Sequence, residues 1–111
     1  MKRLSILAVL AVLGLAAQGA AAKGNIEAGK AKAAQVCAAC HGADGNKPSA
    51  PDQPVLAGQY ADYLVKALSD YKSGKRNNPI MKAFAGQLSH QDMEDVAAWF
   101  SSQSSNLASK R

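Results

Sequence analysis

The sequence predicts an all-α domain with three main helices joined by long loops. Apolar residues recur at intervals of three and four in three stretches, at about residues 25–40, 60–73 and 89–100. No stretch shows the strict apolar and polar alternation of a half-buried strand. The segments between the helical stretches are rich in Gly, Pro and Asn, which favour turns. At 111 residues, the chain forms one domain at most.

The first 22 residues predict a secretory signal peptide, which leaves residues 23–111 as the domain. Lys2 and Arg3 form a positive start, residues 4–15 form an apolar run, and residues 20–22 are small alanines of the kind that precede a cleavage site. The apolar run is shorter than the roughly 20 residues of a membrane-spanning helix. We therefore expect export to the periplasm and no stable membrane insertion after cleavage, with an uncleaved anchor as the alternative.

The charge balance of the chain argues against a nucleic-acid-binding protein. The formal net charge is +5 for the whole chain. It falls to +3 without Lys2 and Arg3, since the leader contains no acidic residue. A nucleic-acid-binding protein requires a clustered basic stripe, which is missing here. A balance this modest predicts weak attraction toward an acidic partner at most.

Asn25 is the predicted N-cap of a first helix that runs to about Cys40. The inward stripe of this helix has unusually small residues, among them Gly29 and Ala33. Small residues on one helix face allow a second helix to approach closely.

The run Cys37-Ala38-Ala39-Cys40-His41 carries the strongest chemical signal in the chain. Residues three and four apart share a helix face, so the two thiols and the imidazole can converge. C-x-x-C-H is the attachment motif of covalent haem c, with thioether bonds to both cysteines and His41 as the proximal iron ligand. A thiol oxidoreductase is the first alternative, but its C-x-x-C motif belongs beside a βαβ unit. A structural zinc site is the second, but it requires four ligands, and His90 is remote from the motif.

With the motifs that follow it, this run resembles the class I cytochromes c, in particular the small bacterial ones of c4 or c553 type. The resemblance implies three main helices and loops wrapped around one covalent haem. Gly29 stands eight residues before Cys37, where the family has a glycine at the crossing of its first and last helices. The family often has an aromatic residue four positions later, whereas this chain has Ala33.

Residues 42–54 are expected to form a loop, because Gly, Pro, Asn and Asp dominate them. The following Pro54-Val55-Leu56-Ala57-Gly58 resembles a P-x-L-x-G segment of the same family. That resemblance implies that the Pro54 carbonyl accepts a hydrogen bond from Nδ1 of His41, and that Leu56 packs on the haem.

The second helical stretch, ending at Gly74, is expected to be mostly core. Its apolar face consists of Tyr60, Tyr63, Leu64, Ala67, Leu68 and Tyr71.

Residues 75–82 are expected to form an irregular loop, and Asn78-Pro79-Ile80-Met81 within it resembles the distal-ligand loop of the family. We therefore expect this loop to bring Met81 to the iron as its sixth ligand. Met1 leaves with the leader, and Met93 has the helical spacing of a core residue. An open iron or one bound by His90 is the alternative.

The last helix is predicted to begin at Ser89, which forms a capping box with Asp92. Its inward residues are Met93, Val96, Ala97 and Phe100, and Trp99 is expected to cover Gly29 and Ala33. His90 is expected on the surface, and residues 101–111 are expected to fray.

Coordination by His41 and Met81 would leave no open position on the iron, which favours electron transfer over catalysis. We therefore expect a carrier of single electrons, not an enzyme, that meets respiratory-chain or dehydrogenase partners through a small, transient interface. A haem enzyme or gas sensor with a displaceable sixth ligand is the alternative. Four basic residues of the two loops are candidates for steering the partner, or they serve solubility alone: Lys47, Lys75, Arg76 and Lys82.

Overall fold

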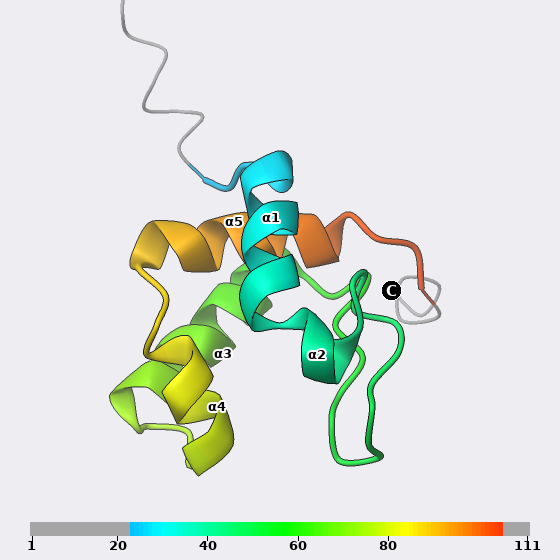
Figure 1. Cartoon of the computed structure of the whole chain (residues 1–111). Helices are drawn as coiled ribbons and strands as arrows, with labels where there is room; N and C mark the ends of the chain where they lie inside the picture. Colours follow the sequence, from blue (N-terminus) through cyan, green and yellow to red (C-terminus); the bar gives the residue numbers. More distant parts are fainter. Residues whose placement is uncertain (1–22, 106–111) are drawn as a thin grey trace, which may run out of the picture.

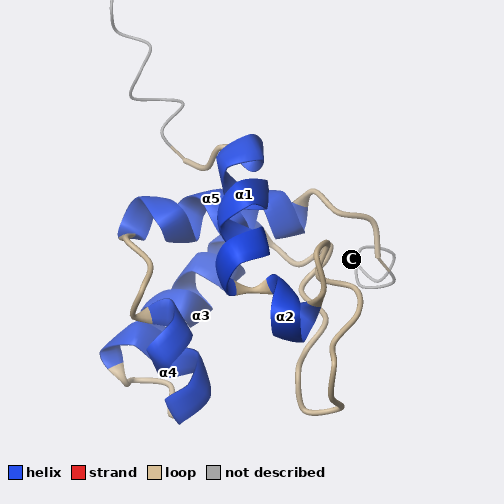
Figure 2. Ribbon diagram, in the orientation of Figure 1, coloured by secondary structure: helices blue, strands red, loops and turns tan. Residues whose placement is uncertain are grey.

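The computed structural model describes residues 23–105, and the predicted leader lies outside this range. Figures 1 and 2 show helices and loops, and no strand occurs among the described residues. The all-α prediction is confirmed, with three longer helices and two short ones. None of the helices in this range has the length and hydropathy to cross a membrane. The helices are α1 (Ile26–Val36), α2 (Ala38–His41), α3 (Ala61–Ser73), α4 (Pro79–Ala85) and α5 (His90–Ser101).

Helix α1 begins where its cap was predicted but ends earlier. The side chain of Asn25 accepts a hydrogen bond from the Ala28 amide at 2.8 Å, as an N-cap does. The expected single helix to Cys40 is wrong, because Cys37 leaves the helical path with φ −107° and ψ −32°. The four-residue helix α2 then starts in a new direction (Figure 1), so Cys37 caps the junction of the two helices while Cys40 lies within α2.

The first and last helices cross at Gly29, as the sequence indicated. Figure 1 shows α1 lying across α5. A Cβ atom on Gly29 would lie 1.9 Å from the carbonyl oxygen of Asp95 and 3.0 Å from Cβ of Trp99. Only a glycine permits backbones this close. The Asn25 amide adds a hydrogen bond to Oδ1 of Asp95 at 2.9 Å, which ties the start of α1 to α5.

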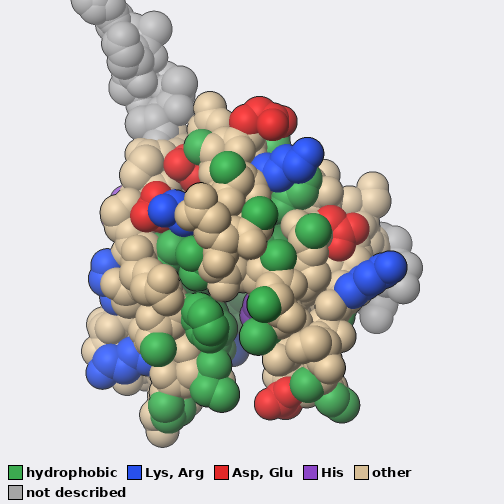
Figure 3. Space-filling model, in the orientation of Figure 1, with side chains coloured by type: hydrophobic (Ala, Val, Ile, Leu, Met, Phe, Trp, Pro, Cys, Tyr) green, Lys and Arg blue, Asp and Glu red, His purple; other side chains and the backbone are tan. Residues whose placement is uncertain are grey.

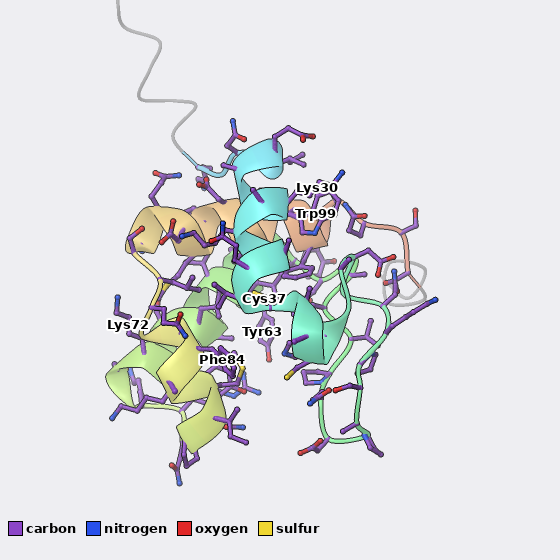
Figure 4. The ribbon with its side chains drawn as sticks, viewed as in Figure 1. Lys30, Cys37, Tyr63, Lys72, Phe84 and Trp99 are labelled. Carbon is purple, nitrogen blue, oxygen red and sulfur yellow. The ribbon has the colours of Figure 1, made fainter. Side chains whose placement is uncertain are left out.

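Trp99 packs beside this crossing and also anchors the loop after α2. Its indole N–H donates to the Ala43 carbonyl at 3.0 Å. The ammonium of Lys30 lies 5.5 Å from its ring centroid, and Figure 4 shows the two side chains together. The side chain therefore joins α1, α5 and the loop that carries the P-x-L-x-G segment.

The core is formed by α1, α3 and α5, and the buried apolar residues of α1 and α5 match the predicted stripes. Met93 is 3% exposed and accepts a hydrogen bond from the Ser69 hydroxyl at 3.5 Å. The prediction for the face of α3 is partly wrong, because Tyr60 and Tyr63 are about half exposed while Leu64 is buried. The central cluster consists of Ala33, Leu64, Val96, Ala97 and Phe100.

The ends of α3 and α5 follow local capping rules. Gly74 ends α3 with φ 85°, a left-handed conformation that glycine adopts without strain. Ser89 and Asp92 form the predicted capping box at the start of α5. His90 is exposed, as expected, and lies 3.3 Å from the carboxylate of Glu94.

The expectation that the chain frays after Phe100 is wrong up to Ser105. Ser101 still belongs to α5. The Ser104 carbonyl accepts a hydrogen bond from the Asn46 side chain at 2.9 Å, and the Ser105 hydroxyl bonds to the Ala57 carbonyl. This segment is therefore held against the loops between α2 and α3, and the rest of the predicted tail lies outside the described residues.

Candidate functional site

A cavity of about 370 Å³ opens between α2 and its following loop on one side and α4 on the other. In Figure 3 the lower half of the molecule is hollowed, with hydrophobic side chains along its walls and a histidine visible inside. The size lies in the range of small-molecule and cofactor sites. Four helices and the turn before α5 supply its apolar lining, which includes Val36, Leu64, Ala67, Leu68, Ile80, Phe84, Ala85, Leu88, Val96, Ala97 and Phe100.

His41 lies at the end of α2, lines the cavity and is 7% exposed. Its Nδ1 lies 3.0 Å from the Pro54 carbonyl oxygen, the hydrogen bond that the sequence indicated. Because a carbonyl only accepts, Nδ1 must carry the proton, which leaves the lone pair on Nε2. The Ser49 amide bonds to the Cys40 carbonyl at 2.9 Å and helps hold the loop beside the imidazole. The ring is therefore fixed in one tautomer.

Both cysteines line the same cavity and are free thiols. Cys37 lies at the junction of α1 and α2, at the top of the opening in Figure 4. Burial raises the pKa of its thiol to about 11. A catalytic thiol requires a lowered pKa, so this environment is the opposite of a reactive cysteine site.

Met81 also lines the cavity, but the prediction that it lies in an irregular loop is wrong. It belongs to the first turn of α4. The Asn78 side chain caps this helix by accepting from the amides of Ile80 and Met81 at 3.1 and 3.0 Å. Pro79 stands at the first helical position, where its missing N–H costs nothing. The same Asn-Pro pair that indicated a loop therefore starts a short helix.

Two residues of the P-x-L-x-G segment, Pro54 and Leu56, line the cavity. Leu56 lines the cavity and packs against the core cluster, and its amide bonds to the Gly45 carbonyl at 2.9 Å. Gly45 has φ 83°, and a Cβ atom there would lie 2.8 Å from both the Ala57 amide and the Phe100 ring. Pro54 is held at its carbonyl by His41. All six predicted site residues therefore line one cavity.

Sequence reasoning missed the apolar wall that α4 and the following turn provide. Ile80, Phe84 and Leu88 recur every four residues, and this spacing could have indicated a helix with one face toward the site. Ile80 is 66% exposed, and Figure 4 shows Phe84 and Tyr63 beside the opening between α4 and α2. Large apolar side chains beside an open cavity are expected where an apolar ligand packs against them.

Of the four basic residues predicted to rim the site, only Arg76 lines the cavity. All four residues, Arg76 included, are exposed.

The lining fits a haem by the chemistry of its donors. A large apolar surface faces two thiols, one imidazole of fixed tautomer and one thioether. These are the side chains that attach and ligate a haem of the c type. No group of three His, Cys, Asp or Glu side chains suited to a metal ion occurs in the part of the chain described.

The sequence matches the cytochrome c family over residues 26–104. It is 52% identical over 99 residues to cytochrome c4 of Pseudomonas aeruginosa, which covers 89% of this chain and 46% of that protein. It is 45% identical over 95 residues to the thiosulfate dehydrogenase electron acceptor of Stutzerimonas stutzeri, covering 83% of this chain and 44% of the relative.

A solved structure, that of reduced recombinant cytochrome c4 from Pseudomonas stutzeri, superposes with a TM-score of 0.66 at 48% identity. The match covers 73% of this chain and 46% of that one. The chain thus spans about half the length of these relatives.

Proposed function

Because this chain belongs to the cytochrome c family and bears its C-x-x-C-H motif, which implies one covalent haem c, we propose that it is an exported carrier of single electrons. One observation supports this most: His41 and Met81 line a single cavity together with both cysteines. When bound, the haem supplies an iron that alternates between the ferric and ferrous states.

In this proposal each side chain of the site has a separate role. Cys37 and Cys40 hold the haem through thioether bonds, and His41 ligates the iron through Nε2. The Pro54 carbonyl orients the imidazole and raises its basicity through the Nδ1 hydrogen bond, 3.0 Å long here. The Met81 thioether would be the second protein ligand to the iron, a soft donor that would favour the reduced state and raise the potential. Leu56 packs on the macrocycle.

The scaffold around these residues suits electron transfer better than catalysis. If the buried His41 and Met81 on its capped helix both bind the iron, they would leave no open position for water or a small substrate. If both ligands stayed bound in the two redox states, little rearrangement would accompany the transfer. A haem enzyme would require one vacant or easily displaced position.

We place the mature protein, residues 23–111, in the periplasm, with residues 1–22 as the cleaved signal peptide. Its partners are redox proteins that dock briefly at the cavity mouth. A dehydrogenase that releases single electrons is one such partner, since a relative is named as the electron acceptor of thiosulfate dehydrogenase. Four exposed cations would raise the association rate with an acidic surface: Lys47, Lys75, Arg76 and Lys82.

The test is an absorption spectrum of the purified, exported protein, followed in the near infrared. The oxidised protein is expected to show the weak charge-transfer band of sulfur-ligated ferric haem. Met81→Ala should abolish this band and keep the covalent haem. Met93→Leu is the matched control, because Met93 is a buried core residue and its loss should leave the band intact. A high-spin wild-type spectrum that changes on addition of a small ligand would contradict the proposal.

A further inference from the structure

Pro54 supplies the carbonyl that fixes His41, but it has no N–H group with which to anchor its own position. Its ring is exposed, so packing holds it little. The carbonyl must therefore be kept in place by the residues on either side of it. On the C-terminal side, the Leu56 amide bonds to the Gly45 carbonyl at 2.9 Å. On the N-terminal side, the neighbour of Pro54 is Gln53.

Gln53 closes a tight turn over residues 49–53 from two directions. Its backbone amide donates to the Ala50 carbonyl at 3.1 Å. Its side-chain Oε1 accepts from the Ser49 amide at 2.8 Å, the Ser49 hydroxyl at 2.9 Å and the Ala50 amide at 3.0 Å. Because backbone amides only donate, the oxygen of the side chain must face them, and not its NH₂ group. One oxygen atom thus gathers three donors and fixes the turn that leads into Pro54.

The same turn is tied to the helix that carries the haem-attachment motif. The Ser49 amide is shared between Oε1 of Gln53 and the Cys40 carbonyl, 2.9 Å away. The contacts form a closed ring that runs through Cys40, Ser49, Gln53, Pro54 and His41. Gln53 is half-buried in this ring and lines the cavity. A change in its side chain therefore moves the Pro54 carbonyl relative to the imidazole.

We infer that Gln53 is a positioning residue for His41: its side-chain oxygen closes the 49–53 turn and so keeps the Pro54 carbonyl on Nδ1 of the imidazole. This assignment rests on the proposed function. A hydrogen bond from Nδ1 to an acceptor raises the basicity of a ligating imidazole. Through Pro54, a loop glutamine thus contributes to the reduction potential.

The experiment measures how fast the Nδ1 proton of His41 exchanges with solvent, by NMR of the isotope-labelled, reduced and haem-loaded protein. Gln53→Ala removes the acceptor of three hydrogen bonds, so the Pro54 carbonyl should leave Nδ1 more often. The exchange rate should rise by about fivefold, the factor that corresponds to the loss of one neutral hydrogen bond. Gln53→Glu keeps a side-chain oxygen for the same donors and should restore a rate close to that of the wild type.

Gln59→Ala is the matched control. Gln59 follows the P-x-L-x-G segment, its Oε1 accepts from the neighbouring Tyr60 amide at 2.8 Å, and it does not line the cavity. The indole N–H of Trp99 is an internal reference in the same spectra, because it bonds to the Ala43 carbonyl outside the turn. A general loosening of the protein would accelerate both protons, whereas loss of positioning accelerates that of His41 alone.

The reduction potential provides the second readout. A weaker Nδ1 hydrogen bond makes the imidazole less basic, so the ferric iron is stabilised less. The potential of Q53A should therefore rise above that of the wild type, while Q59A should leave it unchanged. Q53E is judged by the exchange rate alone, since its added charge acts on the potential directly.

Ser49→Ala keeps the test decisive if Q53A does not take up haem. This variant removes the hydroxyl donor and leaves both amides on Oε1 of Gln53. A smaller acceleration of exchange at His41 is expected in S49A, and a wild-type rate there would contradict the inference.

Equal exchange rates in Q53A and wild type, or equal acceleration of the His41 and Trp99 protons, would overturn the inference and make Gln53 an ordinary turn residue. Such a result leaves the proposed function untouched. Failure of the proposed function is seen in the wild type instead, which would then lack covalent haem or its sulfur-ligation band.

Discussion

Gly29→Ala tests whether the close crossing of α1 and α5 holds the fold together. The added Cβ atom would lie 1.9 Å from the Asp95 carbonyl oxygen and 2.5 Å from its carbonyl carbon. Ordinary contact begins at 3.4 Å, so the two backbones must move apart by about 1.5 Å, the difference between these distances. Neither partner is a flexible side chain, which means that the strain cannot be relieved by a rotamer change.

The expected cost follows from three effects. Overpacking of this kind costs about 1–3 kcal/mol. Separation of the helices also weakens the hydrogen bond from the Asn25 amide to Asp95, worth about 1 kcal/mol. Alanine favours a helix over glycine by about 1 kcal/mol, which offsets the lost bond. We therefore expect the free energy of unfolding of G29A to fall by about 2 kcal/mol.

Guanidinium denaturation of the haem-loaded protein, followed by far-ultraviolet circular dichroism, measures this loss as a lower midpoint at unchanged slope. Gly86→Ala is the matched control. Gly86 has φ −61° at the end of α4, and a Cβ there would meet only carbonyl oxygens of α4, at 3.0 and 3.5 Å. Its effect should stay within about 0.5 kcal/mol. A G29A protein as stable as wild type would refute the reasoning.

Two further perturbations test the anchoring of the loop and of the last helix. Trp99→Phe removes the indole N–H that bonds to the Ala43 carbonyl at 3.0 Å and weakens the cation–π contact with Lys30. We expect the free energy of unfolding to fall by about 1–2 kcal/mol in the same denaturation assay. An unchanged midpoint would show that the hydrogen bond contributes nothing. Asp92→Asn tests the capping box. Hydrogen bonding from the Ser89 amide lowers the pKa of Asp92, so the carboxylate stabilises the folded state above its unfolded pKa of about 3.9 and loses this effect as the pH falls through the folded value. The difference in thermal midpoint between wild type and D92N should thus be constant near neutral pH and shrink below about pH 4; a difference that persists in acid would contradict this.

The sequence predicted the parts of the fold that depend on local chemistry. Asn25 and Ser89 were found as caps because a cap satisfies amides two or three residues away. Gly74 was found as a helix end because the left-handed conformation it adopts is costly for other residues. The hydrogen bond from His41 to Pro54 was indicated by a family resemblance, since the 13-residue separation carries no local signal.

What could not be predicted depends on contacts between distant segments. The break at Cys37 has no breaker residue to mark it, and the alanines on both sides favour a continuous helix. The Asn-Pro pair before Met81 is compatible with a turn or a helix start, and the apolar face of α4 decides for the helix. Ser105 bonds to the Ala57 carbonyl, 48 residues earlier in the chain. The polar residues around Ser105 in the sequence give no sign of this distant contact.

The meeting of α1 with α5 also sets an order of events during folding. Asn25 and Asp95 are 70 residues apart, and closing a loop of that length costs on the order of 4 kcal/mol of chain entropy before any contact compensates for it. The scaffold therefore cannot assemble until its last helix is available. A chain that emerges from its N-terminus, from a ribosome or through a membrane pore, presents Cys37, Cys40 and His41 while they are still unenclosed. Late closure thus keeps the attachment residues accessible during the interval in which a bulky ligand can reach them.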